Sequence, residues 1–171
     1  EILLMHFSTD YIFEGSEGTP YIENSSQNPI NFYGITKQRG EMALKESGCK
    51  YILIRTSWVF SEYGKNFLKT MLSIAQKRDE ISVVNDEIGA PTNAHDIAFM
   101  IINIIDSIDA SDHIKETFHF AGDRPCSWYE FAMKIFYYAN EAGFKTPKKI
   151  IQIKSSEFNS RAKRPKFSFL N

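Results

Sequence analysis

The chain has 171 residues, of which 43% are hydrophobic and 14% aromatic, so it contains enough apolar material for one packed core. Disordered chains are poor in aromatic residues and strongly charged, which excludes global disorder here. With 20 basic and 21 acidic side chains the formal net charge is -1, so no bulk electrostatic field directs the chain toward nucleic acid or anionic lipid.

Membrane and targeting segments are not visible in the sequence. The longest apolar run, 97–105, is much shorter than the roughly 18 residues that a membrane span needs. No basic segment leads into an apolar one, so we expect no signal peptide. The two cysteines, Cys49 and Cys126, are too few for a disulfide framework or a zinc site. We therefore expect a protein of the reducing cytoplasm.

The chain begins with Glu1, directly before an apolar run that is typical of a buried strand. A sheet rarely starts with a central strand that lacks neighbours. At the other end, Asn171 follows no helix or capping signal. We therefore expect a fragment cut at both ends, with a trimmed or processed chain as the alternative.

Apolar and polar stretches alternate along the chain as strands and helices do. The first apolar run, 2–7, leads into a polar loop over 14–28, and a helix is expected over 31–47, with Gly48 as the residue that ends it. Further strands are expected over 51–56, 81–84, 117–121 and 149–153, and further helices over 66–77, 95–108 and 128–142.

The last helix has the clearest start signal, because Ser127 and Glu130 match a capping box. Strands that alternate with helices predict an α/β fold with a largely parallel sheet. The basic tail over 145–166, which includes Arg161, is expected to be a solvated surface, with an anion site as the alternative.

Tyr33 and Lys37 form the most suggestive short motif. Four residues apart on a helix, the phenol and the ammonium project from one face. A free tyrosine has a pKa of about 10, and a neighbouring cation stabilises the phenolate, which makes proton exchange with a carbonyl oxygen feasible. Because the sequence contains eight tyrosines, this spacing also arises by chance, and an ordinary surface pair is the alternative.

Polar residues follow the first two predicted strands, at the sheet edge where open α/β sheets bind ligands. Thr9 and Asp10 come directly after the first apolar run, where a hydroxyl can hydrogen-bond a substrate carbonyl. A polar turn that closes the strand is the alternative. Trp58 follows the second strand, so we expect it at the same edge, where an indole either stacks on a sugar or base or packs internally.

The sequence shows no phosphate-binding turn and no metal site. Dinucleotide-binding folds hold a pyrophosphate on a glycine-rich turn, but stretch 15–18 has neither a third glycine nor a helix after it. Asp86 and Glu87 resemble a carboxylate pair, which a solvated loop explains as well. No metal-ligand spacing connects the four histidines, which are His6, His95, His113 and His119.

Modest motifs are distributed over nearly the whole chain. They occupy residues 7–15, 20–23, 28–31, 33–37, 40–41, 54–60, 66–67, 86–92, 121–122 and 127–132, and they close with Arg164, Pro165, Ser168 and Leu170. In this order they resemble the dTDP-4-dehydrorhamnose reductase family of the extended short-chain dehydrogenase/reductases.

The resemblance implies part of a Rossmann-like doubly wound α/β sheet, with its late strands and helices, and a smaller carboxyl-terminal substrate-binding region. Residues 1–60 would form the late part of the dinucleotide-binding fold with the Tyr/Lys helix, and residues 61–171 mainly the substrate-binding region. The family's amino-terminal half, with its glycine-rich turn, is absent. We therefore expect the chain alone to be inactive or nearly so, and its first strand to offer an open edge to another chain.

The activity that the resemblance implies is the NAD(P)H-dependent reduction of the C4 ketone of dTDP-4-dehydro-L-rhamnose, which gives dTDP-L-rhamnose for cell-surface polysaccharide. Tyr33 would protonate the developing alkoxide, and Lys37 would hold the nicotinamide ribose, so both would also contact the cofactor. Thr9 would hydrogen-bond the substrate oxygen. Asp10 and Trp58 would line the sugar-nucleotide pocket.

The expected cofactor is thus NADPH or NADH, and the residues that choose between the two belong to the missing half. The expected partner is a dTDP-sugar, with no nucleic acid and no membrane. The resemblance alone also implies Mg²⁺ and a homodimer, although the acidic positions of the family's metal-mediated dimer contacts find no match in this sequence.

Three other functions fit parts of the same pattern. A sugar-nucleotide epimerase or dehydratase of the superfamily would use the same tyrosine and lysine. A non-catalytic regulatory subunit, like that of methionine adenosyltransferase, would share the fold, but intact Tyr33, Lys37 and Thr9 count against it. A nucleotide-sugar binding module would bind without oxidising NAD(P)H.

Overall fold

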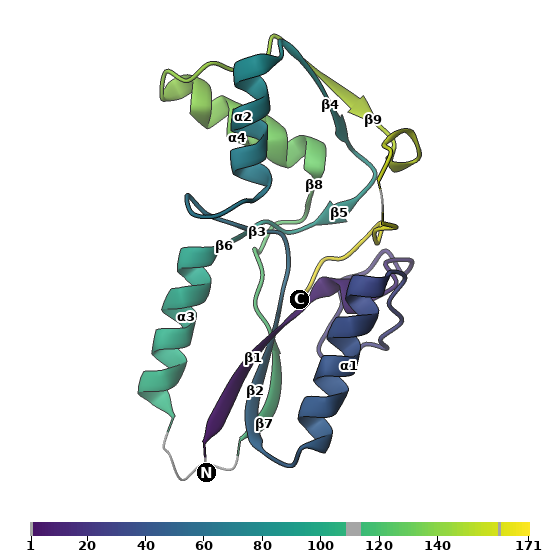
Figure 1. The fold of residues 1–171 in the computed structure, drawn as a ribbon, viewed down its shortest axis with the longest axis vertical. Coiled ribbons are helices and arrows are strands. Elements are labelled where there is room, and N and C mark those ends of the chain that lie inside the picture. The colour runs from purple at the N-terminus through teal and green to yellow at the C-terminus, as the bar shows by residue number, and fades with distance from the viewer. Residues whose placement is uncertain (1, 109–113, 161) are drawn as a thin grey trace.

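A three-stranded parallel sheet, in the order β1-β2-β7, forms the centre of one half of the molecule, the lower half in Figure 1. Its strands are β1 (Leu3–Thr9), β2 (Lys50–Thr56) and β7 (Lys115–His119). Thr9 is paired with Thr56, so β1 and β2 end side by side. The predicted parallel α/β sheet is confirmed.

The computed structural model describes residues 2–108, 114–160 and 162–171. Glu1, His113 and Arg161, which the sequence-based predictions include, lie outside the described residues. Strand β7 comes from the range that was expected to be mainly substrate-binding, so chain order alone does not separate the two regions.

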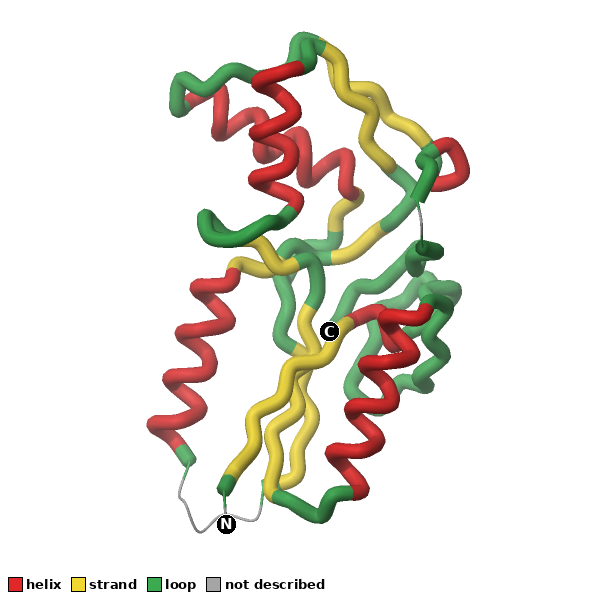
Figure 2. The backbone as a smooth tube through the Cα atoms, in the orientation of Figure 1, coloured by secondary structure: helices red, strands yellow, loops and turns green. Residues whose placement is uncertain are grey.

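Two helices flank this sheet, α1 (Phe32–Glu46) on one side and α3 (Ala94–Ser107) on the other, as Figures 1 and 2 show. Helix α1 begins where the side-chain oxygen of Asn31 accepts a hydrogen bond from the Gly34 amide over 2.8 Å. It ends before Gly48, whose φ of 76° is the left-handed conformation that glycine adopts without strain. The predicted helix boundaries are confirmed.

The other half of the molecule packs two helices against a small sheet, the upper half in Figure 1. The helices are α2 (Phe67–Lys77) and α4 (Trp128–Glu141), and the parallel strands are β4 (Glu80–Val84) and β9 (Lys149–Ile153). The predicted capping box of α4 is present in full. One buried cluster fills this half: Met71, Ala75, Ile81, Val83, Phe131, Ala132, Ile135 and Phe136.

Short strands join the two halves. They are β3 (Val59–Phe60) paired with β6 (Thr92–Asn93), and β5 (Ile88–Gly89) paired with β8 (Cys126–Ser127). Two single-turn 3₁₀ helices, η1 (Asp10–Ile12) and η2 (Ser155–Glu157), complete the described elements. Two-residue strands are too short to show an alternation of apolar and polar residues, so no sequence pattern predicts them.

The carboxyl-terminal segment also ties the halves together, and it ends beside the carboxyl end of β1 (Figure 1). Leu170 bridges to Tyr21 in the lower half, and Phe167 bridges to Ile88 at the junction. The Ser168 amide donates a 2.8 Å hydrogen bond to the Ile88 carbonyl. This segment is therefore anchored by backbone pairing rather than by a helix.

Candidate functional site

The Tyr/Lys motif lies on the first turns of α1, next to β1. The Lys37 Nζ donates a 2.8 Å hydrogen bond to the carbonyl of Phe7, so the ammonium reaches back to the end of the strand. The Tyr33 side chain is 51% exposed, and its ring meets the ring of Tyr11 edge-on at 5.9 Å between centroids. The phenol is thus supported on one side and open to a ligand on the other.

Gly34 explains how α1 comes so close to the end of β1. A Cβ at this position would overlap the carbonyl oxygen of Tyr11 in η1. Only glycine allows the helix to pack directly on η1. This packing brings the start of α1, with Tyr33 and Lys37, close in space to the end of β1, with Thr9 and Asp10. The motif therefore needs its glycine for packing.

Thr9 and Asp10 lie at the carboxyl end of β1 and are both buried. The Thr9 hydroxyl accepts a hydrogen bond from the Tyr11 amide over 3.2 Å and donates one to Asp10 Oδ1 over 3.0 Å. Burial raises the pKa of Asp10 to about 6, against the opposing effect of hydrogen bonds from Ser168 and Thr9. Asp10 is thus a carboxyl group that changes its charge in the mildly acidic range.

Trp58 lies just beyond the end of β2 and has a φ of 47°, which is unusual for a residue other than glycine. Its carbonyl accepts a hydrogen bond from the Thr92 amide over 3.3 Å. Its indole stacks on that of Trp128, with 3.4 Å between ring centroids and 5° between planes. The predicted position at the same sheet edge as Thr9 is confirmed by the pairing of Thr9 with Thr56.

Glu87 connects the stacked indoles to the carboxyl-terminal segment. Its Oε2 accepts a 3.2 Å hydrogen bond from Trp128 Nε1 and lies 3.9 Å from Arg164 Nη1. Burial raises the pKa of Glu87, against the opposing effects of the Arg164 charge and the Trp128 N–H. A solvated loop therefore does not describe Glu87, although Asp86 is only partly buried and accepts two hydrogen bonds from Ser155.

Four residues of this neighbourhood were not predicted as site residues: Tyr11, Glu87, Trp128 and Arg164. Burial raises the pKa of Tyr11, and the charge of Asp10 adds to the effect. Trp128 had one available signal, because it is one of only two tryptophans and follows the capping residue of α4. Nothing in the spacing of Glu87 and Arg164 indicates that they meet.

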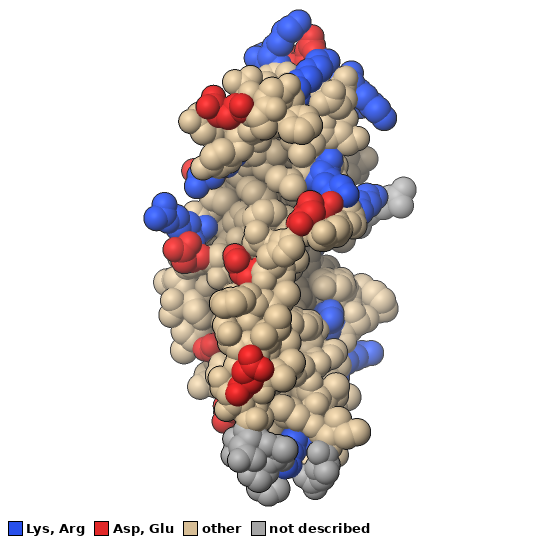
Figure 3. Space-filling view, turned by 90° about the vertical axis from the view of Figure 1, so that its left-hand side faces the viewer, with Lys and Arg blue, Asp and Glu red and all other residues tan. Residues whose placement is uncertain are grey.

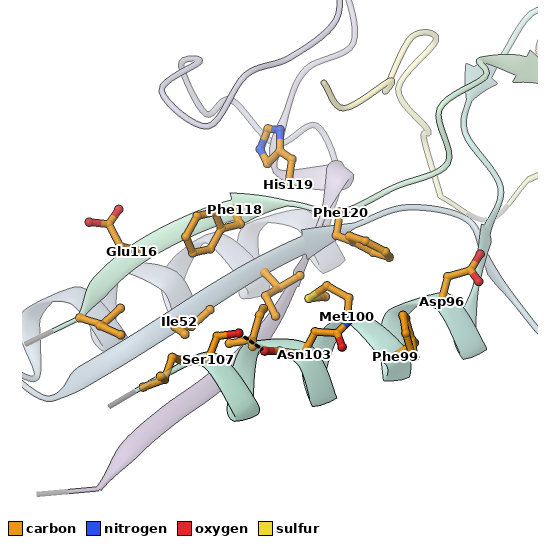
Figure 4. Close-up of a pocket in the computed structure, with 14 residues that line it drawn as sticks. Ile52, Asp96, Phe99, Met100, Asn103, Ser107, Glu116, Phe118, His119 and Phe120 are labelled. Atoms are coloured by element: carbon orange, nitrogen blue, oxygen red, sulfur yellow. Dashed lines mark hydrogen bonds between the residues drawn. The ribbon is translucent and has the colours of Figure 1, made fainter. Parts of the chain in front are cut away.

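A groove of about 810 Å³ lies elsewhere, between α3 and the sheet (Figure 4). Its lining is mostly apolar and includes Phe99, Met100 and Phe118. None of the predicted site residues lines it. The face of the molecule that carries α3 shows mainly uncharged side chains (Figure 3).

A second groove, of about 740 Å³, lies against α2 and α4 and also holds none of the predicted site residues. Within residues 2–108, 114–160 and 162–171, no group of three or more His, Cys, Asp or Glu side chains is placed to hold a metal ion. Over the same residues, no helix is long and apolar enough to cross a membrane.

The parallel sheet, with the Tyr/Lys helix packed beside a strand that ends in threonine, belongs to a Rossmann-like α/β protein. The model of one family in this class, the RmlD substrate binding domain, matches residues 1–171. The chain belongs to this family.

Curated relatives agree with this assignment. The chain is 36% identical to dTDP-4-dehydrorhamnose reductase from Shigella flexneri and 39% identical to that from Aggregatibacter actinomycetemcomitans, over 98% of its own length in both cases. These alignments cover 56% and 58% of the relatives, respectively. The chain thus spans little more than half the length of the relatives it matches.

Solved structures show the same relation. The dTDP-4-dehydrorhamnose reductase from Bacillus anthracis, solved in complex with NADP, superposes with a TM-score of 0.87 at 40% identity, over 98% of this chain and 56% of that one. The orthologue from Clostridium acetobutylicum gives 0.86 at 37% identity, with the same coverage. A UDP-glucuronic acid 4-epimerase from Bacillus cereus gives 0.71 at 15% identity, which shows a shared fold alone.

Proposed function

We propose that this chain provides the catalytic and substrate-binding part of a dTDP-4-dehydrorhamnose reductase. The complete protein would reduce the C4 ketone of dTDP-4-dehydro-L-rhamnose with NADPH or NADH and release dTDP-L-rhamnose. The observation that carries the proposal is the packing of the Tyr33 and Lys37 helix on the end of β1, beside Thr9 and Asp10. The identity of 36–40% with reductases, against 15% with an epimerase, favours reduction over epimerisation.

A nicotinamide cofactor supplies the hydride for such a reduction when it is bound. The half-exposed Tyr33 phenol then protonates the C4 oxygen as negative charge develops on it. Lys37, whose Nζ already donates to the Phe7 carbonyl, keeps two further N–H donors for the cofactor ribose and the phenolate oxygen. These two residues are the proposed cofactor contacts of this chain.

Substrate binding falls to residues at the junction of the two halves. The Thr9 hydroxyl is positioned by the Tyr11 amide and exchanges its bond to Asp10 for one to the substrate oxygen. Asp10 then accepts hydrogen bonds from the sugar, and Trp58 borders the sugar ring. Because carboxyl and hydroxyl groups are buried here, an analogue lacking the matching polar group leaves them unpaired and binds poorly.

The length of the relatives suggests how the site is completed. Strand β1 is at one edge of its sheet and has no neighbour on its outer side among the described residues. In the proposal, a further amino-terminal part pairs with this edge and supplies the glycine-rich turn for the pyrophosphate. The 171-residue chain alone is then inactive or nearly so. The proposed compartment is the cytoplasm, and the proposed assembly is a homodimer.

The test compares this chain with a version extended at its amino-terminus to the length of the relatives. Oxidation of NADPH and of NADH is followed with dTDP-4-dehydro-L-rhamnose as substrate. We expect turnover in the extended protein only, and a loss of about 100-fold or more in kcat for Tyr33→Phe. Tyr63→Phe, which alters an exposed phenol on the loop before α2, is the matched control and should keep full activity.

Two results would count against the proposal. Absence of turnover in the extended protein, together with tight binding of a nucleotide sugar or of a protein partner, would support a non-catalytic module instead. Turnover that survives Tyr33→Phe would move the proton transfer to another group. Comparison of NADPH with NADH settles the cofactor preference, and size-exclusion chromatography of the extended protein tests the dimer.

A further inference from the structure

The two tryptophans of the chain lie face to face. The rings of Trp58 and Trp128 are 3.4 Å apart between centroids and only 5° from parallel. Isolated aromatic pairs prefer offset or edge-to-face arrangements, because the π faces repel each other in a direct sandwich. Other contacts must therefore hold this pair in place.

Trp58 is held from its backbone and from one side of its ring. Its φ of 47° is a strained conformation that persists only where the surrounding structure enforces it, and such positions cluster at functional sites. A Cβ on Gly89 would come within 2.5 Å of the Trp58 indole, so the ring rests directly on the glycine backbone. The indole nevertheless remains partly exposed.

Trp128 is held independently of Trp58. It is the first residue of α4, directly after the capping residue Ser127. Its Nε1 donates to Glu87 Oε2 over 3.2 Å, and the ring of Phe67 lies 4.6 Å away. Glu87 is 7% exposed and therefore fixed by its surroundings. The second indole is thus a rigid support fastened to the upper half of the molecule.

We infer that Trp128 and Glu87 are positioning residues for the sugar-nucleotide site, which act by fixing the Trp58 indole where it borders the sugar ring. The inference rests on the proposed function. Trp58 follows β2 by two residues, and β2 ends beside Thr9, the proposed hydrogen-bond donor to the substrate oxygen. The upper half thereby positions one side of the proposed site, whose reacting groups belong to the lower half.

The test measures KM and kcat separately in the extended protein. Glu87→Ala and Trp128→Phe both remove the N–H to carboxylate bond and should raise KM for the sugar nucleotide by about tenfold, with kcat within roughly twofold of the parent. Glu87→Gln keeps an acceptor oxygen for the indole and should restore most of the affinity. Glu46→Ala, on the exposed end of α1, is the matched control and should change neither value.

A spectroscopic readout needs no substrate. Because the two indoles are stacked and no other tryptophan is present, the parent should show a far-ultraviolet exciton couplet in circular dichroism. Trp58→Phe and Trp128→Phe should both abolish it, Glu87→Ala should weaken it, and Glu87→Gln should retain it. An unchanged couplet in Glu87→Ala would overturn the positioning of Trp128 by Glu87.

Failure of this inference and failure of the proposed function give different results. Reductase turnover with an unchanged KM in Glu87→Ala and Trp128→Phe would overturn the inference and leave the function standing. If the parent does not turn over but binds dTDP-L-rhamnose, weaker binding by Glu87→Ala supports the inference while the reductase proposal fails. If the parent does not bind this nucleotide sugar at all, both proposals fall.

Discussion

The buried residues of the two halves are organised differently. The upper half has one continuous core of eight buried residues between its helices and its small sheet. The lower half has two smaller buried clusters. Both halves leave large apolar side chains exposed, such as Phe99 at 66% in the lower half and Tyr138 at 67% in the upper half. The proposed reacting residues lie on the half whose buried residues form two separate clusters.

This difference separates two tasks. The upper half carries Trp128 and Glu87, which are joined by a hydrogen bond and are proposed to position the Trp58 indole beside the substrate. The lower half carries Tyr33, Lys37 and Thr9, on a sheet whose edge and α3 groove stay open among the described residues. In the proposed function, positioning thus relies on the half with one continuous core, and the reacting groups lie on the sheet whose β1 edge has no neighbour among the described residues.

The largest effect is expected from breaking the buried ion pair of the lower half. Arg55 and Glu41 are 1% and 0% exposed, and two hydrogen bonds of 3.0 and 2.8 Å join them. Burial alone would raise the pKa of Glu41, but the Arg55 hydrogen bonds lower it below its ordinary value. Glu41→Leu leaves the guanidinium buried without its partner and should lower the free energy of unfolding by about 4 kcal/mol.

Urea denaturation, followed by circular dichroism, measures this loss. Glu46→Leu, an exposed position on the same helix, is the control and should change stability little. If Glu41→Leu costs less than about 1 kcal/mol, the pair does not organise the lower half.

A core truncation in the upper half should have the next largest effect. Ile135 is 5% exposed inside the main cluster, so Ile135→Ala removes buried apolar atoms and leaves a cavity. We expect a loss of about 3 kcal/mol. Ile135→Ala and Glu41→Leu together test whether the halves unfold independently. If they do, there are two unfolding transitions, and each variant shifts only one of them. If the protein unfolds as one cooperative unit, both variants shift a single transition.

The pH dependence of stability should show the burial of Asp10. Its pKa rises from 3.8 to about 6 on folding, so between these values the folded protein binds the proton more tightly than the unfolded chain. Its contribution therefore destabilises the fold as the pH rises from about 4 to 6, by about 3 kcal/mol at most. Asp10→Asn should gain stability relative to the parent over that range.

Unfolding free energies at several pH values, for the parent and for Asp10→Asn, provide the measurement. The lowered pKa of Glu41 acts with the opposite sign, because its stabilisation is lost as the pH falls. Both proteins contain Glu41, so its contribution cancels when the unfolding free energy of one is subtracted from that of the other. A difference that stays constant between pH 4 and 6 would contradict the assigned burial of Asp10.

The smallest effect is expected at the start of α4. The Ser127 hydroxyl accepts a hydrogen bond from the Glu130 amide over 3.0 Å and donates one to Asn85 over 2.7 Å. Ser127→Ala removes both and should cost about 1 kcal/mol in thermal or chemical unfolding. Ser127→Thr, which keeps a hydroxyl, should lose less. An equal loss in both variants would mean that packing, and not the cap, matters at this position.

The sequence by itself determined the features that depend on neighbours along the chain. Apolar periodicity located the main helices and the longer strands, and the capping signals of Ser127 and Gly48 located where helices begin and end. The spacing of Tyr33 and Lys37 placed two chemically matched groups on one helical face. These features depend on backbone geometry over only a few residues, so the local order of the residue types is enough to predict them.

Only the tertiary structure decided which distant residues meet. Four contacts join separate segments of the chain. They are the ion pair of Glu41 with Arg55, the hydrogen bond from Trp128 to Glu87, the stacking of Trp58 on Trp128, and the close approach of Gly34 to Tyr11. The sequence pattern shows that such groups are present but not which of them pair. Their pairing depends on how the chain as a whole buries apolar surface, because a polar group left without a partner inside costs too much to keep.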